Sequence, residues 1–189
     1  MTYIYTPNTS LVVTVDEAKK FASIYRPDQD AMIESFIVSA QTLFEAYTQQ
    51  TLLTTNFTLY LESLPKCTKI IKTPFASLTS IEYLDDNDVW TAIDTSYYTL
   101  IIGNPYYSVY LTSSFISPSD ISITNPQKWR INFVAGRATA DDVPESIKQT
   151  IKNIVTDAYE HRTVEEEFAL FNVDQVHMLM NVHRIPGIR

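Results

Sequence analysis

The chain has 189 residues, of which 45% are hydrophobic, including 12 Tyr and 9 Phe. This length and this aromatic content predict a packed core and exclude a disordered chain. The formal net charge of −8 argues against a protein that grips nucleic acid, because phosphate contacts come mainly from Lys and Arg.

Further classes of protein are excluded by what the sequence lacks. No apolar run approaches the roughly 18 to 20 residues that a membrane span needs. Met1–Tyr5 has no basic region followed by an apolar stretch, so we expect no signal peptide. Cys67 is the only cysteine, which precludes an internal disulfide and suits a protein made in a reducing cytoplasm. The three glycines lie too far apart for a phosphate-binding loop.

Two helices are predicted near the N-terminus. Thr14 can cap free backbone amides while Glu17 reaches back, which is a capping box. Pro27 is expected to end this first helix. A second helix, from about Asp28 or Asp30 to Thr48, would be roughly 30 Å long. Its apolar positions recur at helical spacing and comprise Ile33, Phe36, Ile37, Ala40, Phe44 and Tyr47.

After Leu53 the periodicity changes to two, which predicts strands. Phe57, Leu59 and Leu61 alternate with Thr58, Tyr60 and Glu62. Further runs typical of strands cover residues 69–72, 78–84, 89–93, 97–102, 108–112 and 129–135. The cluster Asp85-Asp86-Asn87-Asp88 between two of these runs predicts a hairpin tip. Many short antiparallel strands favour a small sheet or sandwich.

Helical spacing returns in the C-terminal quarter of the chain. Pro144, preceded by Asp141 and Asp142, predicts the start of a helix that continues to about His161 or Arg162. A short helix from about Asp174 to Asn181 follows. The remaining residues, 183–189, are expected to form an extended tail.

The order of helices, then strands, then helices predicts an α+β fold. We expect a helical domain made of residues 1–55 and 138–189. An antiparallel β-rich subdomain, residues 56–137, would be inserted into it, and the chain would end in the extended tail.

Nothing in the sequence indicates catalysis. The spacing of His177 and His183 does not place two metal ligands on one helix face, and a single cysteine excludes a zinc cluster. The acidic cluster lacks the glycine and the bidentate glutamate of a calcium loop. No Gly-x-Ser-x-Gly motif is present, and Cys67 lies between Lys66 and Lys69 without a motif. We therefore expect no catalytic residues, no metal, no cofactor and no enzymatic activity.

Tyrosines crowd one stretch of the β-rich segment: Tyr97, Tyr98, Tyr106, Tyr107 and Tyr110. Exposed tyrosines favour interfaces, because they are large, rigid and amphipathic. The same residues are also typical of strands, where they pack against one another. The sequence leaves both interpretations open.

Three segments, in order, are similar to motifs of one known family. Val13–Lys19 is similar to an opening "Leu-Thr-x-Asp/Glu-Glu-Ala-Lys", and Asp30–Thr48 to a second helix that ends in a Glu-x-Tyr/Phe-Thr group. Ile131–Gly136 is similar to a strand ending in "Tyr-x-Ala-Gly", with Phe133 at the aromatic position. Val143–Gln149 and Tyr159–Arg162 are similar to the "Val-Pro-x-x-Ile/Leu-Lys" start and "Tyr-Glu-x-Arg" end of the helix that follows. Together, over roughly residues 11–162, the chain resembles the head–tail connector proteins of tailed bacteriophages.

This resemblance implies a structural adaptor without catalysis. Such subunits assemble in the host cytoplasm and are located in the virion neck, as a ring, typically a dodecamer, beneath the portal protein. The ring extends the channel through which DNA passes without sequence-specific binding. It also offers a platform for a stopper or tail-completion protein, and no membrane is involved.

The C-terminal tail is the predicted portal-docking segment. Its apolar residues have little else to pack against, and its arginines can pair with acidic residues of a portal. The predicted docking residues are Val182, Arg184, Ile185, Pro186, Ile188 and Arg189. The alternatives are a frayed terminus and, for the whole protein, a carbohydrate- or protein-binding β module on a helical stalk that uses the tyrosine cluster as its surface.

Overall fold

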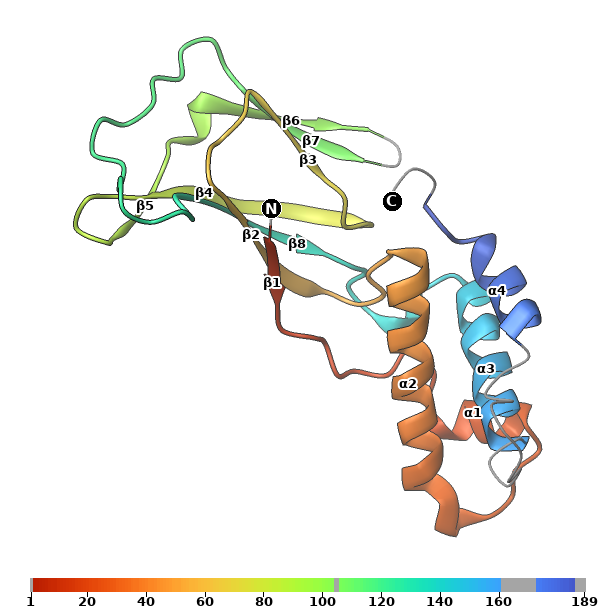
Figure 1. Cartoon of the computed structure of the whole chain (residues 1–189). Helices are drawn as coiled ribbons and strands as arrows, with labels where there is room; N and C mark the ends of the chain where they lie inside the picture. Colours follow the sequence, from red (N-terminus) through yellow and green to blue (C-terminus); the bar gives the residue numbers. More distant parts are fainter. Residues whose placement is uncertain (1, 104–105, 161–172, 186–189) are drawn as a thin grey trace. The chain divides into compact units, whose positions relative to one another are not determined.

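The computed structural model describes residues 2–103, 106–160 and 173–185. The chain forms two compact units, which we call the β unit (Met1–Asn8 and Thr54–Gly136) and the helical unit (Thr9–Leu53 and Arg137–Arg189). The first consists of antiparallel strands and the second of helices (Figure 1). The predicted α+β class is therefore confirmed.

The boundaries of the units differ from the predicted division at the N-terminus. Residues 1–8 belong to the β unit, whereas the sequence placed residues 1–55 in the helical domain. The physical reason is strand β1 (Thr2–Tyr5), which pairs along its whole length with β2 (Thr55–Leu61). Its residues, Thr2–Tyr5, do not alternate between polar and apolar side chains, so no local pattern predicted this strand.

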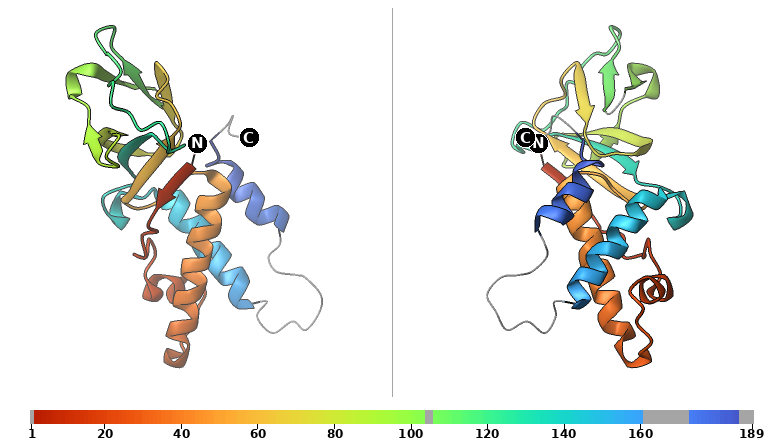
Figure 2. Two further views of the ribbon diagram at one scale, coloured as in Figure 1. Left: turned by 60° about the vertical axis from the view of Figure 1, so that its left-hand side comes forward. Right: turned by 90° about the vertical axis from the view of Figure 1, so that its right-hand side faces the viewer.

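The described residues of the helical unit form the helices α1 (Val15–Phe21), α2 (Asp30–Thr48), α3 (Glu145–Glu160) and α4 (Val173–Asn181). Short 3₁₀ turns, η1 (Pro27–Gln29) and η3 (Ala140–Asp142), precede α2 and α3. Helices α2 and α3 lie side by side in both views of Figure 2, in agreement with their direct contacts. The predicted positions of α2, α3 and α4 agree with the structure.

The ends of the first two helices follow from local chemistry. Thr14 Oγ1 accepts a hydrogen bond from the Glu17 backbone at 3.2 Å, and the Thr14 N–H donates to the Glu17 carboxylate at 2.8 Å. This is the predicted capping box. The helix, however, ends at Phe21 and not at Pro27, because Ser23 takes a left-handed conformation (φ 55°). Helix α2 ends at Thr48, because the next residue, Gln49, takes a left-handed conformation (φ 61°).

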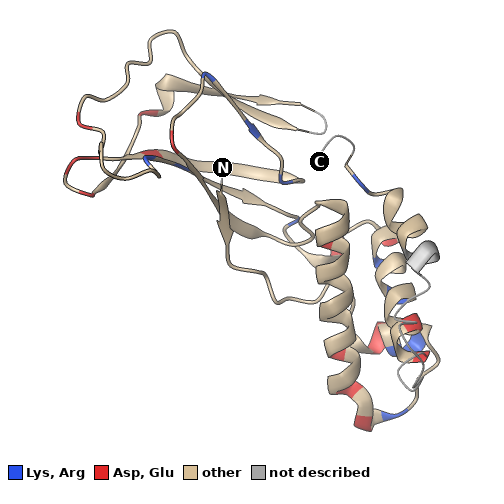
Figure 3. Cartoon of the chain, in the orientation of Figure 1, with Lys and Arg blue, Asp and Glu red and all other residues tan. Residues whose placement is uncertain are grey.

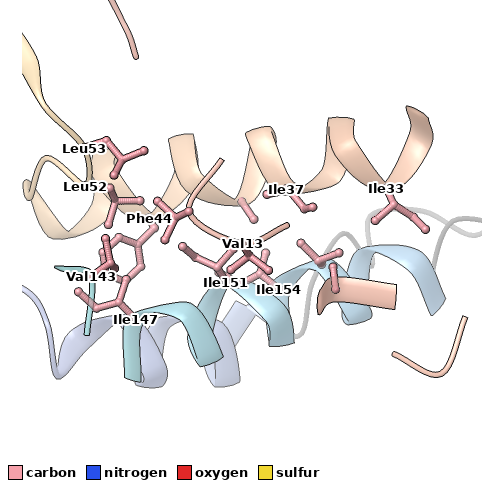
Figure 4. Close-up of a cluster of buried hydrophobic side chains, with 14 of the residues drawn as sticks. Val13, Ile33, Ile37, Phe44, Leu52, Leu53, Val143, Ile147, Ile151 and Ile154 are labelled. Carbon is pink, nitrogen blue, oxygen red and sulfur yellow. The ribbon is translucent and has the colours of Figure 1, made fainter. Parts of the chain in front are cut away.

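One apolar core holds the helices together. Residues spaced along the facing sides of α2 and α3 meet in it, among them Ile37 and Phe44 opposite Ile151 and Ile154 (Figure 4). Val13 and Leu52, from the segments that flank the first two helices, complete the packing. Each such side chain contributes roughly 1.5 to 3 kcal/mol when it is removed from water.

The strands in the described part of the β unit form two antiparallel sheets. The first has the order β1-β2-β8-β4-β5 and the second the order β3-β7-β6. The remaining strands are β3 (Cys67–Ile70), β4 (Phe75–Leu84), β5 (Trp90–Ala92), β6 (Tyr98–Ile102), β7 (Tyr107–Leu111) and β8 (Trp129–Ala135), with the 3₁₀ turn η2 (Thr95–Tyr97) before β6. All strands predicted from the sequence are present within a few residues of their expected positions.

Both sheets contribute to a single apolar core. From the first sheet come alternate residues of β2, β4 and β8, with Phe133 stacked on Phe57 at 5.3 Å between ring centroids. Ile70 of β3 and Val109 of β7 come from the second sheet and are almost fully buried. The β unit is thus a small sandwich, one of the two arrangements that the sequence favoured.

Gly136 ends the last strand at a position that favours glycine. Its φ is 103°, a conformation that other residues rarely adopt, and its N–H donates to the Pro74 carbonyl at 2.8 Å. The chain turns here from the β unit to the helical unit, which gives a physical reason for the Ala135-Gly136 motif. Of the residues described, none belongs to a helix long and apolar enough to cross a membrane.

Candidate assembly surfaces

The described residues contain no group of three or more His, Cys, Asp or Glu side chains placed to hold a metal ion. The acidic cluster forms the β4–β5 hairpin tip, as predicted. The Asp85 carboxylate accepts hydrogen bonds from the backbone N–H groups of Asn87 and Val89, both at 2.8 Å. Its oxygens therefore shape the turn.

Cys67 is a half-buried free thiol on strand β3, opposite Tyr110 of β7. The hydrogen bond between the Cys67 thiol and the Tyr110 hydroxyl raises the pKa of Tyr110. The arrangement is a cross-strand contact, and it gives no support for nucleophilic chemistry at Cys67.

The predicted tyrosine cluster is divided by the sheet. Tyr107 stacks on Phe75 at 4.6 Å and packs against the core of the β unit, as does Tyr98, whose pKa is raised by burial. Tyr110 lies on the opposite face of the sheet and is exposed. Tyr97 contacts Phe115 edge-on at 5.9 Å, and Tyr106 is half-buried. The packing interpretation therefore holds for Tyr98 and Tyr107, and the tyrosines do not form one binding surface.

Strand β6 presents exposed apolar residues that the sequence analysis did not single out. Ile101 is 50% and Ile102 is 75% exposed, at the outer edge of the three-stranded sheet. A usable signal was present in the sequence, because Tyr98–Ile102 is a run of β-forming residues without charge, Pro or Gly. Such runs at a sheet edge favour pairing with another strand.

The C-terminal segment is attached to α2 more firmly than the sequence suggested. Ile185, predicted to be a free docking residue, is only 8% exposed, and its N–H donates to the Thr48 carbonyl at 3.4 Å. His177 stacks on Tyr47 at 4.7 Å, and the Tyr47 hydroxyl donates to Asn181 at 2.7 Å. The prediction that Ile185 lacks a partner in its own domain is therefore wrong.

The other predicted docking residues differ among themselves. Val182 is 81% exposed, and Arg184 is exposed with its guanidinium 5.5 Å from the centre of the Tyr47 ring. Pro186, Ile188 and Arg189 lie outside the described residues. Met178 and Leu179, one turn before Val182, are also exposed. An apolar patch thus lies on α4 and just beyond its C-terminal end.

Charged residues are unevenly distributed over the β unit (Figure 3). Lys66 directly precedes β3 and Lys69 lies within it, and both are exposed. Acidic residues lie at the end of β4 and in its turn, where Asp86 is hydrogen-bonded through its backbone to Asp120 at 2.8 Å. Acidic residues thus gather at the β4–β5 turn, beside Lys128, whose carbonyl accepts a hydrogen bond from the Leu84 N–H at 2.9 Å.

No protein-family model matches the sequence, and no curated protein matches it significantly. Three solved structures, in contrast, contain a chain of the same fold. One is the neck of an empty gene transfer agent particle, computed with C6 symmetry, at 17% identity and a TM-score of 0.79. The alignment covers 100% of this chain and 98% of the other. The fold is that of a chain from a phage-like particle.

The two further structures are similar over the same extent. The virion of a native gene transfer agent particle contains a chain with 18% identity and a TM-score of 0.78. The neck of the native particle, computed with C12 symmetry, contains one with 16% identity and a TM-score of 0.71. In both, 100% of this chain and 98% of the other are covered. Both units of the present chain, together with their connections, therefore occur in the gene transfer agent chain.

Proposed function

We propose that this chain is a structural, non-catalytic head–tail connector of a tailed phage or phage-like particle. In this proposal, copies of the chain form a ring on the portal protein, in the virion neck, after assembly in the host cytoplasm. The ring extends the DNA channel and provides the attachment platform for a stopper or tail-completion protein.

The observation that carries the proposal is the extent of the structural similarity. A common small domain can recur in unrelated proteins, and fold alone does not imply function. Here a helical unit interrupted by a β sandwich matches a chain in a gene transfer agent neck from end to end. The resemblance of three sequence segments to phage connectors points independently to the same class.

The proposed ring requires unlike surfaces on the two sides of each copy, because a closed ring is built from heterologous contacts. The described part of the chain offers such surfaces. Exposed apolar residues occur on the helical unit at Phe21, Tyr25 and Val38, and on the β unit at Ile101 and Ile102. The net charge of −8 suits a channel wall along which DNA slides without being held.

For portal docking, we propose a reduced set of residues. Val182 and Arg184 are exposed and available, whereas Ile185 anchors the segment to α2. A single docked segment would bind weakly, because burying one valine contributes only about 1.5 to 3 kcal/mol before ordering costs. A ring of segments on a symmetric portal would gain affinity through multivalency.

The test is electron microscopy of the purified chain mixed with the portal of its own particle. We expect a ring added to one end of the portal. Two variants locate the docking residues: a double substitution, Val182→Ser with Arg184→Ser, and a chain that ends at residue 185. Both leave Ile185 in place. Ile123→Ser, at a residue 86% exposed in the β unit, is the matched control.

The outcomes separate the parts of the proposal. Loss of the ring in either C-terminal variant, but not in the control, supports docking through this segment. If both variants still form rings, the connector role stands and the docking site lies elsewhere in the chain. Failure of the full-length chain to associate at any salt concentration contradicts the connector role and favours the β binding module. That module is the weaker candidate, because its tyrosines do not share one face of the sheet.

A further inference from the structure

The outer edge of β6 lacks the usual protection of a sheet edge. Edge strands in soluble proteins are commonly blunted by lysine, proline or a bulge. Tyr98–Ile102 contains neither residue, and its pairing with β7 runs without a register shift. Ile101 and Ile102 are exposed, and the described residues provide no second strand beside β6. This edge is therefore suited to pairing with a strand from outside the chain.

The hydrogen-bonding phase shows which backbone groups point outward from β6. The Thr112 N–H donates to the Tyr97 carbonyl at 2.9 Å, so these two residues are a hydrogen-bonded pair. Because bonded pairs alternate along an antiparallel ladder, Thr99 and Ile101 bond to β7 in the same way. The N–H and C=O groups of Tyr98, Leu100 and Ile102 consequently point away from the sheet.

Strand β3, at the opposite edge of the sheet, also has backbone groups that point outward at alternate residues. The Leu111 N–H donates to the Lys66 carbonyl at 3.0 Å, which makes these two a bonded pair. By the same alternation, Thr68 bonds to β7 while the backbone groups of Cys67 and Lys69 point outward. Both edges of this sheet thus present backbone donors and acceptors at alternate residues.

The β6 edge of one copy and the β3 edge of another can pair, because the two strands agree in direction, in the face on which their side chains lie, and in register. Strands β3 and β6 are both antiparallel to β7, so they are parallel to each other. A rotation of a twelfth of a turn, the symmetry with which one of the similar necks was computed, changes the direction of a strand by no more than about 30° between neighbouring copies. Leu100 and Thr68 are level, since both lie opposite Val109, and both face the core side of the sheet.

We propose that, in the ring of the proposed function, β6 of each copy pairs in parallel with β3 of the next copy. In a parallel ladder a residue bonds to the two neighbours of the residue opposite it. Leu100 would accordingly bond to Cys67 and Lys69 of the next copy, the two residues whose backbone groups point outward. The three-stranded sheet then continues from copy to copy without a slip in register.

Charge complementarity supports this pairing. Asp94 is exposed just before η2, at the end of β6 that begins with Tyr98. Lys66 is exposed at the same end of β3, because it is paired with Leu111, the residue opposite Tyr98. With Leu100 level with Thr68 of the next copy, these unlike charges lie at the same end of the contact. The Lys69 side chain points to the solvent face of the sheet and leaves the edge open.

A disulfide tests the register directly. Thr99 and Cys67 both lie opposite Tyr110, on the solvent face of the sheet. In the proposed contact, Thr99→Cys of one copy and Cys67 of the next would lie roughly 4.8 Å apart, within the range that a disulfide spans. Within one copy β7 separates the two positions by about twice that distance, which is too far for a bridge.

The experiment uses full-length T99C assembled on its portal and then mildly oxidised. We expect a ladder of covalent oligomers larger than a dimer on a non-reducing gel. The double variant C67S/T99C should lose every species above the dimer. I116C, which places a cysteine at an exposed loop residue, is the matched control and should give no such ladder.

A second variant tests the edge without a cysteine. The Ile102 N–H points outward and its side chain is largely exposed, so Ile102→Pro should preserve the fold while it blocks the edge. We expect I102P to retain the wild-type circular dichroism spectrum and to lose the ring. Ring formation by I102P at wild-type protein concentration would overturn the proposed pairing.

Failure of this inference is distinguishable from failure of the connector role. Rings that form on the portal without a covalent ladder in T99C would refute the β6–β3 contact and leave the connector intact. Absence of any ring from the wild-type chain would refute both.

Discussion

The signals that define the helical unit and the β unit differ in how far apart the interacting residues lie in the sequence. In the helical unit, the caps and the apolar stripes arise from residues within a few turns of one another, as in the Thr14–Glu17 capping box. In the β unit, the central strand β8 pairs with β2 and β4, and its Asn132 contacts Thr58 across 74 positions of the sequence. Local sequence patterns therefore indicate where helices and strands lie, whereas long-range packing determines which strands pair.

The largest expected effects come from one matched substitution in the core of each unit. Phe44→Ala and Phe133→Ala both remove an almost fully buried ring, so each should lower the free energy of unfolding by about 3 to 5 kcal/mol. Backbone amide hydrogen exchange should become faster in α2 and α3 for Phe44→Ala, and in β2, β4 and β8 for Phe133→Ala. A cost below about 1 kcal/mol for Phe133→Ala would mean that the sandwich does not depend on its central ring stack.

A smaller effect distinguishes the two faces of the C-terminal segment. Ile185→Ala should cost about 2 kcal/mol in a urea titration, because it empties a buried position. Val182→Ala, at an exposed residue three positions earlier, should change the free energy of unfolding by no more than about 0.5 kcal/mol. Equal effects of the two substitutions would contradict the attachment of this segment through Ile185.

In the β unit, a polar network across β4 and β8 should contribute less than the ring stack. The Glu82 carboxylate accepts hydrogen bonds from Arg130 and Ser80, both at 2.5 Å, and from Asn132 at 3.0 Å. Glu82→Gln should cost about 1.5 to 3 kcal/mol, since charge-assisted bonds are lost. Exposed Glu62→Gln is the control, and its effect should be negligible.

The same network predicts a pH dependence. Burial raises the pKa of Glu82, but the hydrogen bonds from Ser80 and Arg130 outweigh it and hold the pKa below the ordinary glutamate value. A lowered pKa stabilises the fold fully above the ordinary value, and this stabilisation is lost as the pH falls through the lowered pKa. Denaturation midpoints measured across this acid range should fall less steeply for Glu82→Gln than for the wild-type chain.

A small effect is expected from the helix caps of the helical unit. Thr14→Ala removes the capping box of α1 and should cost about 1 kcal/mol. Thr139→Ala removes the same kind of box from the three-residue turn η3 and should cost less, because fewer backbone amides depend on it. Thermal unfolding of the two variants measures the difference, and a larger loss for Thr139→Ala would reverse this ranking.

The sequence predicted the elements better than their partners. Helix α2 begins and ends where its apolar spacing does, and Phe57, Leu59 and Leu61 are buried as their alternation indicates. Strand β1 was missed because its four residues are held by pairing with β2 and by the contact of Tyr5 with Phe57 at 5.1 Å. No local pattern encodes such contacts.

For the candidate surfaces, the sequence identified residue types but not their exposure. Tyr98 and Tyr110 looked alike in the sequence, yet one packs against the core and the other faces solvent, because alternate residues of a strand point to opposite faces. Ile185 looked free because its partner Thr48 lies far away in the chain, at the end of α2. The open edge of β6 became visible only when the strand order was known.

We have proposed that this chain is a ring subunit of a particle neck. The most direct measurement is a cryo-electron microscopy map of the neck of the particle that carries it, at a resolution that identifies side chains. We predict a ring of copies between the portal and the tail. A neck without this chain, or with the chain bound as isolated copies, would contradict the account.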